Sequence, residues 1–217
     1  MSVTREQLEQ TAEALRRNNM DAYCVDTKDE AVALLKSLLK TGDSVGVGGS
    51  RTLDELGVIE LLRSGEYRFI DRYESGLTPD QLREKYVAAL GADVFLCSSN
   101  AVTMNGELYN VDGMSNRVAA LCYGPRSVIL VVGKNKIVPD LKAAEHRVKT
   151  IAAPLNAQRL HCDTYCRTQN VCKQADGEYC TDGCGSPARI CCTYVTMGHQ
   201  RIAGRIKVIL VDEQLGF

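Results

Sequence analysis

Helix and strand signals alternate along the first half of the chain, and this alternation limits the folds open to it. Capping boxes, in which a Thr precedes a Gln or Glu by three residues, predict helices that begin after Thr4 and Thr27. Apolar runs and turn residues predict strands at 22–25, 44–47, 67–70 and 93–97, and helices at 52–62 and from Pro79. This order predicts an α/β fold with a parallel sheet and flanking helices.

The pattern changes in the second half of the chain. The pair Asn105-Gly106 between two apolar runs predicts a β-hairpin over 102–111. A helix over 116–123, a buried strand over 127–132, a helix from Pro139 to about residue 151 and a closing strand over 205–211 are then expected. The 217 residues fit one domain, so we expect a single domain over 1–217.

Seven of the ten cysteines lie between Cys162 and Cys192. The surrounding segment, 161–192, is rich in Gly, Asp and Thr and has no hydrophobic periodicity, so it is predicted to be a loop inserted before the last strand. A packed core does not need this density of sulfur. The segment is therefore expected to hold a metal ion, an iron–sulfur cluster or disulfides.

The composition of the chain limits which partners, cellular location and cysteine chemistry are expected. The net charge is −1 and no basic run exists, which argues against a nucleic-acid partner. No apolar signal core follows Met1 and no stretch is long enough to cross a bilayer, so we expect a cytoplasmic protein without a membrane span. Thiols in the cytoplasm are kept reduced, which favours metal or redox chemistry over structural disulfides. The sequence does not decide whether the protein forms a homo-oligomer.

The cysteine spacing does not identify the metal. It matches neither the C-x2-C pairs of a zinc ribbon nor the C-x2-C-x2-C run of a ferredoxin. Four thiolates can hold tetrahedral zinc or an iron–sulfur cluster. The side chains of adjacent Cys191 and Cys192 diverge, so only one of the two is expected to be a ligand.

A glycine-rich turn, GVGGSRTLDELG over 46–57, joins a predicted strand to a predicted helix. Glycine lets backbone N–H groups approach a ligand closely, and a helix N-terminus favours an anion. This turn is therefore a candidate anion site, and the alternative is a tight turn without a ligand. Its candidate ligand-binding residues are Gly48, Gly49, Ser50, Arg51 and Thr52.

Two further polar segments, 98–103 and 110–117, follow predicted strands. Asn100, Thr103 and Asn116 are candidate ligand-binding residues, on the hypothesis that these segments converge with the glycine-rich turn. Asp112 is the candidate acid–base group, and Arg117 or Arg51 is the candidate partner for a substrate carboxylate. The alternative is that Asp112 forms a turn and Asn116 caps a helix. Whether the chain is an enzyme is left open.

Four blocks of sequence resemble the LUD-domain family of lactate-utilisation proteins. They are GVGGSRTLDELG, SSNAVTMNGELYNVDGMSNRVAALCYGP, VVGKNKIVPDL and GRIKVILVDEQLGF, in the order of the family and over nearly the whole chain. The resemblance implies a Rossmann-like sheet of the NagB/RpiA/CoA-transferase type. It also implies a link to the oxidation of L-lactate to pyruvate, together with iron–sulfur partner proteins. Family members are similar to formyltetrahydrofolate cyclo-ligase, which binds a nucleotide.

The resemblance to a small cysteine-rich subgroup implies four metal-binding cysteines. Its elements T-x-C-x5-C and S-P-x-R-I-C fall on Cys166, Cys172, Cys184 and Cys191. The chain departs from the subgroup in having Tyr165 where proline is usual and a long link between Cys172 and Cys184. Because the link brings in Cys180, the third ligand is expected to be either Cys184 or Cys180.

Three functions are therefore considered. The first is an iron–sulfur-binding component or accessory of L-lactate oxidation that binds a small anion, with a [4Fe-4S] cluster favoured over zinc. The second is a zinc-stabilised protein of transferase or isomerase type that binds a nucleotide, CoA or a sugar phosphate. The third is a non-catalytic thiol redox sensor, for which the surplus cysteines are suited.

Overall fold

A six-stranded parallel sheet forms the centre of the molecule. The computed structural model describes residues 3–217, so Met1 and Ser2 of the expected domain lie outside the described residues. The strand order is β1-β10-β7-β4-β2-β3, and every neighbouring pair is parallel. The strands are β1 (Asp21–Val25), β2 (Ser44–Val47), β3 (Arg68–Phe69), β4 (Val94–Cys97), β7 (Ser127–Gly133) and β10 (Ile206–Val211). The predicted α/β class with a parallel sheet is confirmed.

Both faces of this sheet are covered, which explains why its central strands lack polar alternation. Successive residues of β7 point to opposite faces, so Val128 and Leu130 enter one core and Ile129 and Val131 the other. The first face packs on α1 (Arg5–Arg17), α5 (Pro79–Leu90) and α6 (Asn116–Cys122). The second packs on α2 (Lys28–Leu38), α3 (Arg51–Glu55) and α4 (Val58–Leu62).

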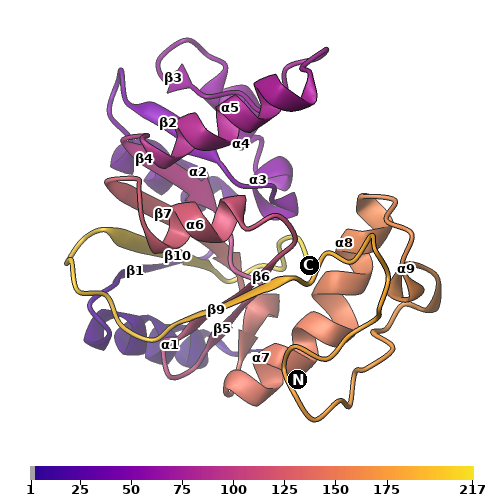
Figure 1. Ribbon diagram of the computed structural model, residues 1–217. Coiled ribbons are helices and arrows are strands. Elements are labelled where there is room, and N and C mark those ends of the chain that lie inside the picture. The colour runs from indigo at the N-terminus through magenta and orange to yellow at the C-terminus, as the bar shows by residue number, and fades with distance from the viewer. Residues whose placement is uncertain (1–2) are drawn as a thin grey trace.

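A smaller second sheet lies beside the first (Figure 1). Its order is β8 (Ile137–Val138), β5 (Ala101–Thr103), β6 (Leu108–Asp112) and β9 (Thr193–Met197). The antiparallel pair β5–β6 is the predicted hairpin, with Gly106 at φ +81° in its turn. Val102, Leu108 and Met197 join the core of the main sheet, while Tyr109 and Val111 on the other face pack against the helix that begins at Leu141.

Three elements differ from the sequence prediction. The predicted helix 52–62 is two short helices, α3 and α4, because Gly57 between them has a left-handed backbone with φ +64°. Strands β8 and β9 were not predicted, since each is short and borders a loop or turn. As β9 pairs antiparallel with β6, the cysteine segment leads into this edge strand rather than directly into the last strand, β10.

The helix predicted to end near residue 151 continues to Arg159, so that prediction of its end is wrong. Helix α7 (Leu141–Arg147), a π-helical turn over 148–152 and α8 (Ala153–Arg159) follow one another without a break. Pro154 lacks an N–H and its ring clashes with a carbonyl one turn earlier in a regular helix. The wide turn before Pro154 relieves that conflict, with the N–H of Ala153 donating to the carbonyl of Val148.

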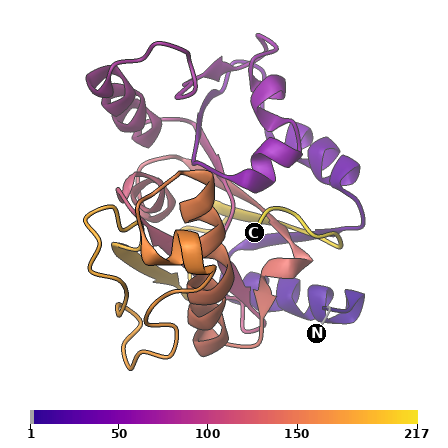
Figure 2. The same cartoon turned by 90° about the vertical axis from the view of Figure 1, so that its right-hand side faces the viewer.

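The cysteine segment has little regular structure. It contains one short helix, α9 (Tyr165–Gln169), and otherwise runs as an irregular trace beside α8 (Figure 2). Its ends are held by α8 and by the pairing of β9 with β6. Among residues 3–217, no helix is both long and apolar enough to cross a membrane.

Gly46 allows α5 to pack closely on β2, and this contact can be tested. A Cβ at residue 46 would lie 2.7 Å from Cβ of Ala89. Because the Cβ of Ala89 is bonded directly to the backbone, no side-chain rotation can move it away. We expect Gly46→Ala to lower the free energy of unfolding by about 1–3 kcal/mol, the usual cost of overpacking. Urea denaturation measures this change.

Gly91→Ala is the matched control. Gly91 follows α5 at φ −96°, and the nearest atom to a Cβ there is 3.6 Å away. Removing a glycine at such a position costs little in the folded state and restricts the unfolded chain. Equal destabilisation by the two substitutions would contradict the packing explanation for Gly46.

Candidate functional site

A cavity of about 360 Å³ opens at the carboxyl ends of the central strands. Its walls come from the loops that follow β2, β4, β6 and β7, together with α5 and α8. The chain turns from β2 towards β3 and from β4 towards β7, in opposite directions, so a crevice forms between these neighbouring strands. Open α/β sheets bind ligands at this kind of position.

Arg117 on α6 ties these loops together from beneath the cavity. Its two terminal nitrogens donate four hydrogen bonds, to the backbone carbonyls of Ser98 and Val111 and to the side-chain oxygens of Asn110 and Asn100. The Nε atom lies 3.2 Å from a carboxylate oxygen of Asp112. With 9% of its surface exposed, Arg117 has its donors committed within the protein.

The carboxylate of Asp112, like the guanidinium of Arg117, is fixed by several contacts within the protein. Its Oδ1 accepts hydrogen bonds from the backbone N–H groups of Met114 and Ser115, and its Oδ2 faces Arg117. These contacts form the turn that the sequence offered as the alternative to catalysis. A catalytic role for Asp112 and Arg117 stays a prediction.

The glycine-rich turn lies directly over Arg117. A Cβ at Gly48 would meet the side chain of Arg117 at 2.9 Å, so glycine is required for this packing. Ser50 caps α3, accepting a hydrogen bond from the N–H of Leu53. Arg51 is exposed and pairs with Glu55 at 3.2 Å.

The structure brings most of the predicted ligand-binding residues to one cavity. Those that line it are Gly49, Ser50, Arg51, Asn100, Asn116, Asp112 and Arg117. Gly48 and Thr52 do not line it. Thr103 is not at the cavity, because its hydroxyl is bonded to Glu107 in the hairpin turn.

Lys136 is a residue of the cavity that the sequence prediction missed. It is 3% exposed, and its Nζ donates to the hydroxyls of Thr52 at 2.7 Å and Ser98 at 3.1 Å. Burial lowers the pKa of Lys136 to about 7, and the nearby charges of Arg147 and Arg117 act in the same direction. The VVGKNKIVPDL block contains this lysine, but nothing local in the block distinguishes it from an exposed one.

Two arginines at the cavity were also missed. A Cβ at Gly49 would lie 3.8 Å from Nη2 of Arg159 and 3.9 Å from Nη1 of Arg72, so both guanidinium groups lie close to the position where a side chain would be. Arg72 follows β3, and no motif marks it. Arg159 reaches the cavity only because the helix continues past Pro154, whereas the sequence prediction ended that helix before Pro154.

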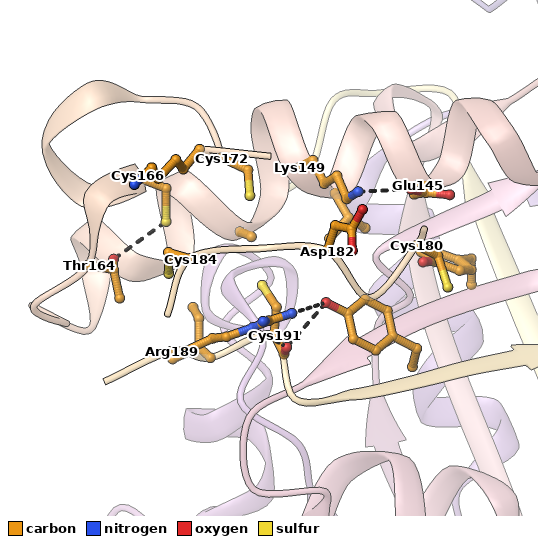
Figure 3. Close-up of a pocket in the computed structure, with 16 residues that line it drawn as sticks. Glu145, Lys149, Thr164, Cys166, Cys172, Cys180, Asp182, Cys184, Arg189 and Cys191 are labelled. Carbon is orange, nitrogen blue, oxygen red and sulfur yellow. Dashed lines mark hydrogen bonds and ion pairs between the residues drawn. The ribbon is translucent and has the colours of Figure 1, made fainter. Parts of the chain in front are cut away.

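A second, much smaller cavity of about 30 Å³ lies in the cysteine segment. Five cysteines line it: Cys166, Cys172, Cys180, Cys184 and Cys191. In Figure 3, Cys166, Cys172, Cys184 and Cys191 lie around a common space, and Cys180 lies farther along the cavity. Cys192 does not line this cavity and is exposed.

The four thiols around the common space are free and partly or fully buried. All ten cysteines are free; Cys166 is buried, and Cys172, Cys184 and Cys191 are half-buried. Burial raises the pKa of Cys191 to about 12, and the neighbouring thiols of Cys166, Cys172 and Cys184 add to the increase. Within residues 3–217, no three His, Cys, Asp or Glu side chains are grouped closely enough to hold a metal ion. Metal binding would require the thiols to lose their protons and move closer together.

Three cationic side chains border the thiol cavity: Lys149, Lys173 and Arg189. Lys149 pairs with Glu145 at 2.9 Å and donates to the carbonyl of Tyr179. Arg189 donates to the carbonyls of Cys191 and Thr181 and to the hydroxyl of Tyr194. Of the three, only Lys149 has a carboxylate partner in the described residues, so the charges of Arg189 and Lys173 are available to offset thiolates.

The two cavities are separated by one short piece of chain. Ile190 lines both of them. Its backbone packs against Gly113, where a Cβ would be 3.4 Å away, and the N–H of Cys192 donates to the carbonyl of Asp112. The residue pair Ile190-Cys191 is therefore the wall between the thiol cavity and the larger cavity.

Comparison with known proteins identifies the family. The profile of the LUD domain matches residues 8–211. The chain belongs to the LUD-domain family. This family is associated with lactate utilisation, as the sequence resemblance implied.

A solved structure supports the same fold. The crystal structure of a DUF162 family protein from Deinococcus radiodurans is similar to this LUD-domain chain with a TM-score of 0.50 at 18% sequence identity. The similarity covers 95% of this chain and 96% of that one. No curated protein matches the chain.

Lys136→Met should change how stability depends on pH. Folded Lys136 has a pKa of about 7, and unfolded lysine titrates near its ordinary value of about 10.4, so between these pH values the unfolded state binds more protons. Raising the pH through this window therefore stabilises the wild type by about 1.4 kcal/mol per unit. Below pH 7 the lysine is protonated in both states and the effect vanishes.

The measurement is urea denaturation of both proteins from pH 6 to 9.5 under reducing conditions. The free energy of unfolding of the wild type, relative to Lys136→Met, should rise with pH above about 7. Titrating groups that do not interact with Lys136 are present in both proteins and cancel in the difference. Parallel pH curves for the two proteins would contradict a lowered pKa at Lys136.

Proposed function

We propose that this LUD-domain protein is an iron–sulfur-binding component of L-lactate oxidation to pyruvate, and that it binds a small anion in the larger cavity. One observation carries the cluster assignment: of the five cysteines that line the thiol cavity, four from separate parts of the cysteine segment lie around a common space. These thiols belong to Cys166, Cys172, Cys184 and Cys191. Their sequence elements are also those that the family resemblance assigned to metal binding.

The chemistry of the donor set fits a [4Fe-4S] cluster. Such clusters are held by four cysteine thiolates. Val148, Ala153 and Ile190 contribute apolar side chains to the wall of the thiol cavity. Arg189 supplies positive charge beside the thiols, as a buried anionic centre needs. The four thiols would hold the cluster, and a cluster supplies one-electron transfer when bound.

The cysteine segment forms one part of the wall of the thiol cavity, and Tyr109, Val148 and Ala153 contribute to the rest. Both ends of the segment are fixed, by α8 and by β9, while its middle is irregular. The segment also carries exposed Tyr179 and exposed Cys180. This arrangement suits a protein that passes electrons to or from iron–sulfur partner proteins.

The larger cavity supports the anion-binding part of the proposal. Five cationic side chains line it, and Asp112 is the single acidic one among the described residues that do so. Asn100 and Asn116 add polar side chains that can orient a carboxylate or hydroxyl. In a lactate-oxidising system the protein's own residues would therefore bind and orient the anion. Asp112 is proposed as the group that would accept or donate a proton.

Cysteine variants test the cluster. Protein purified without oxygen is expected to be brown, to absorb visible blue light and to contain iron and acid-labile sulfide. Cys184→Ser should lose most of the visible absorption and the iron, because the thiolate ligands are not replaced by a hydroxyl. Absorption spectra with iron, sulfide and zinc analysis measure the outcome.

Cys180→Ser is the matched control, since Cys180 lies in the same segment but apart from the four thiols. It should retain the colour and the iron of the wild type. Colourless protein with stoichiometric zinc would overturn the iron–sulfur proposal in favour of a zinc-stabilised protein. Metal-free, fully folded protein whose cysteines form disulfides with oxidant would favour a thiol redox sensor.

A further inference from the structure

Three of the cations around the larger cavity form no ion pair within residues 3–217. Arg117 pairs with Asp112, and Arg51 pairs with Glu55. The remaining cations of the lining are Lys136, Arg72 and Arg159. Across residues 3–217, none of these three has a carboxylate oxygen within the 4.0 Å of an ion pair.

Lys136 lies at the bottom of the cavity. Its hydrogen-bond partners are the neutral hydroxyls of Thr52 and Ser98, and it is 3% exposed. A charged amine at such a site is costly without an opposite charge. The structure offers the amine no counter-ion, so an anionic ligand would supply it.

Arg72 and Arg159 both approach the open side of Gly49. The guanidinium of Arg72 stacks on the ring of Tyr86, 4.6 Å from its centroid, and its Nε is buried without a hydrogen-bond partner. Arg159 directs two nitrogens at one oxygen of Asn156, which leaves its Nη1 free. The absence of a side chain at Gly49 leaves both guanidinium groups open to a ligand.

We propose that the cavity binds a small phosphate ester with at least two negative charges. Its phosphate would lie between Arg72 and Arg159, and a second anionic group would face Lys136. A monocarboxylate such as L-lactate carries one charge and would leave two of the three cations unpaired. A phosphate group carries about two charges and presents three acceptor oxygens, which suit paired guanidinium groups. The inference depends on the proposed function only in taking the cavity to bind an anion.

The mouth of the cavity accommodates a less polar portion of such an ester. Met114 is 75% exposed and Leu160 is 48% exposed, and both line the cavity. Exposed apolar side chains beside a charged pocket are typical of a ligand site with a charged end and an uncharged body. The cavity volume, about 360 Å³, lies at the lower end of the range of small-molecule sites, about 300–1,000 Å³.

Calorimetry with simple probes tests the proposal on protein purified without oxygen. The probes are pyrophosphate, which supplies two linked phosphate groups, and L-lactate. Pyrophosphate should bind at least tenfold more tightly than L-lactate at moderate salt. Arg159→Gln should weaken pyrophosphate binding at least tenfold, and because Arg159 is exposed this variant is expected to fold normally.

Arg83→Gln is the matched control. Arg83 is an exposed arginine on α5 that does not line the cavity, so its loss should leave pyrophosphate binding unchanged. Absence of pyrophosphate binding, equal binding of L-lactate, or equal effects of Arg159→Gln and Arg83→Gln would each overturn the proposal.

Proton uptake distinguishes a direct contact at Lys136 from general attraction. The charged or titratable groups around Lys136 are Arg147, Arg117, Glu55 and Cys97. At pH 8 the lysine is mainly neutral in the free protein, and an anion beside it would favour the protonated form. Binding measured in buffers of different ionisation enthalpy should therefore show proton uptake in the wild type, and less uptake in Lys136→Met. Equal uptake by the two proteins would contradict the placement of an anion at Lys136.

The experiments can contradict the cluster proposal and the phosphate-ester proposal independently of each other. Brown protein that binds no pyrophosphate overturns the phosphate ester and leaves the cluster intact. Colourless protein that binds pyrophosphate through Arg159 supports the phosphate ester and counts against the cluster.

Discussion

The buried guanidinium of Arg117 is the contact on which the larger cavity depends. It joins the loop after β4, the end of β6 and the Asp112 turn through five polar contacts, and the glycine-rich turn packs on its aliphatic portion. Breaking a buried pair of this kind typically costs about 3–5 kcal/mol, because the remaining charge is left without a partner. The pairing of Arg117 within the protein also leaves Lys136, Arg72 and Arg159 as the cations available to a ligand. The charged residues that hold the cavity together are therefore different from the charged residues that are available to a ligand.

The main sheet was predictable because its signals are local. Capping boxes at Thr4 and Thr27, apolar runs and the Asn105-Gly106 turn each act over a few residues, and the elements they predict are present. The same reasoning found Gly49, Ser50 and Asn100 at the cavity, since turns at the carboxyl ends of parallel strands meet at one edge. Thr103 was misplaced because it lies within β5 rather than beyond the end of a strand.

The residues that sequence reasoning missed owe their position to tertiary structure. Lys136 becomes a buried amine only when β7 places the following turn beneath α3, and Arg72 has no neighbour in sequence that marks it. Arg159 depends on a helix that passes through Pro154 by way of a π-helical turn, against the ordinary effect of proline. Spacing rules likewise could not separate Cys180 from Cys184, since only the three-dimensional structure places Cys184 with the other three thiols and Cys180 farther off.

The shared wall at Ile190 makes the two cavities interdependent. Ile190 contacts one space and Cys191 the other, and the backbone that joins them is fixed to the Asp112–Gly113 turn. Any change of the thiol centre that shifts this backbone also alters the fit of a ligand in the larger cavity. Because binding free energies at two linked sites are reciprocal, the ligand must then alter the binding or oxidation equilibrium of the thiol centre by the same factor. If both sites are occupied as proposed, their coupling would need no more than the backbone at Ile190, which lines both cavities.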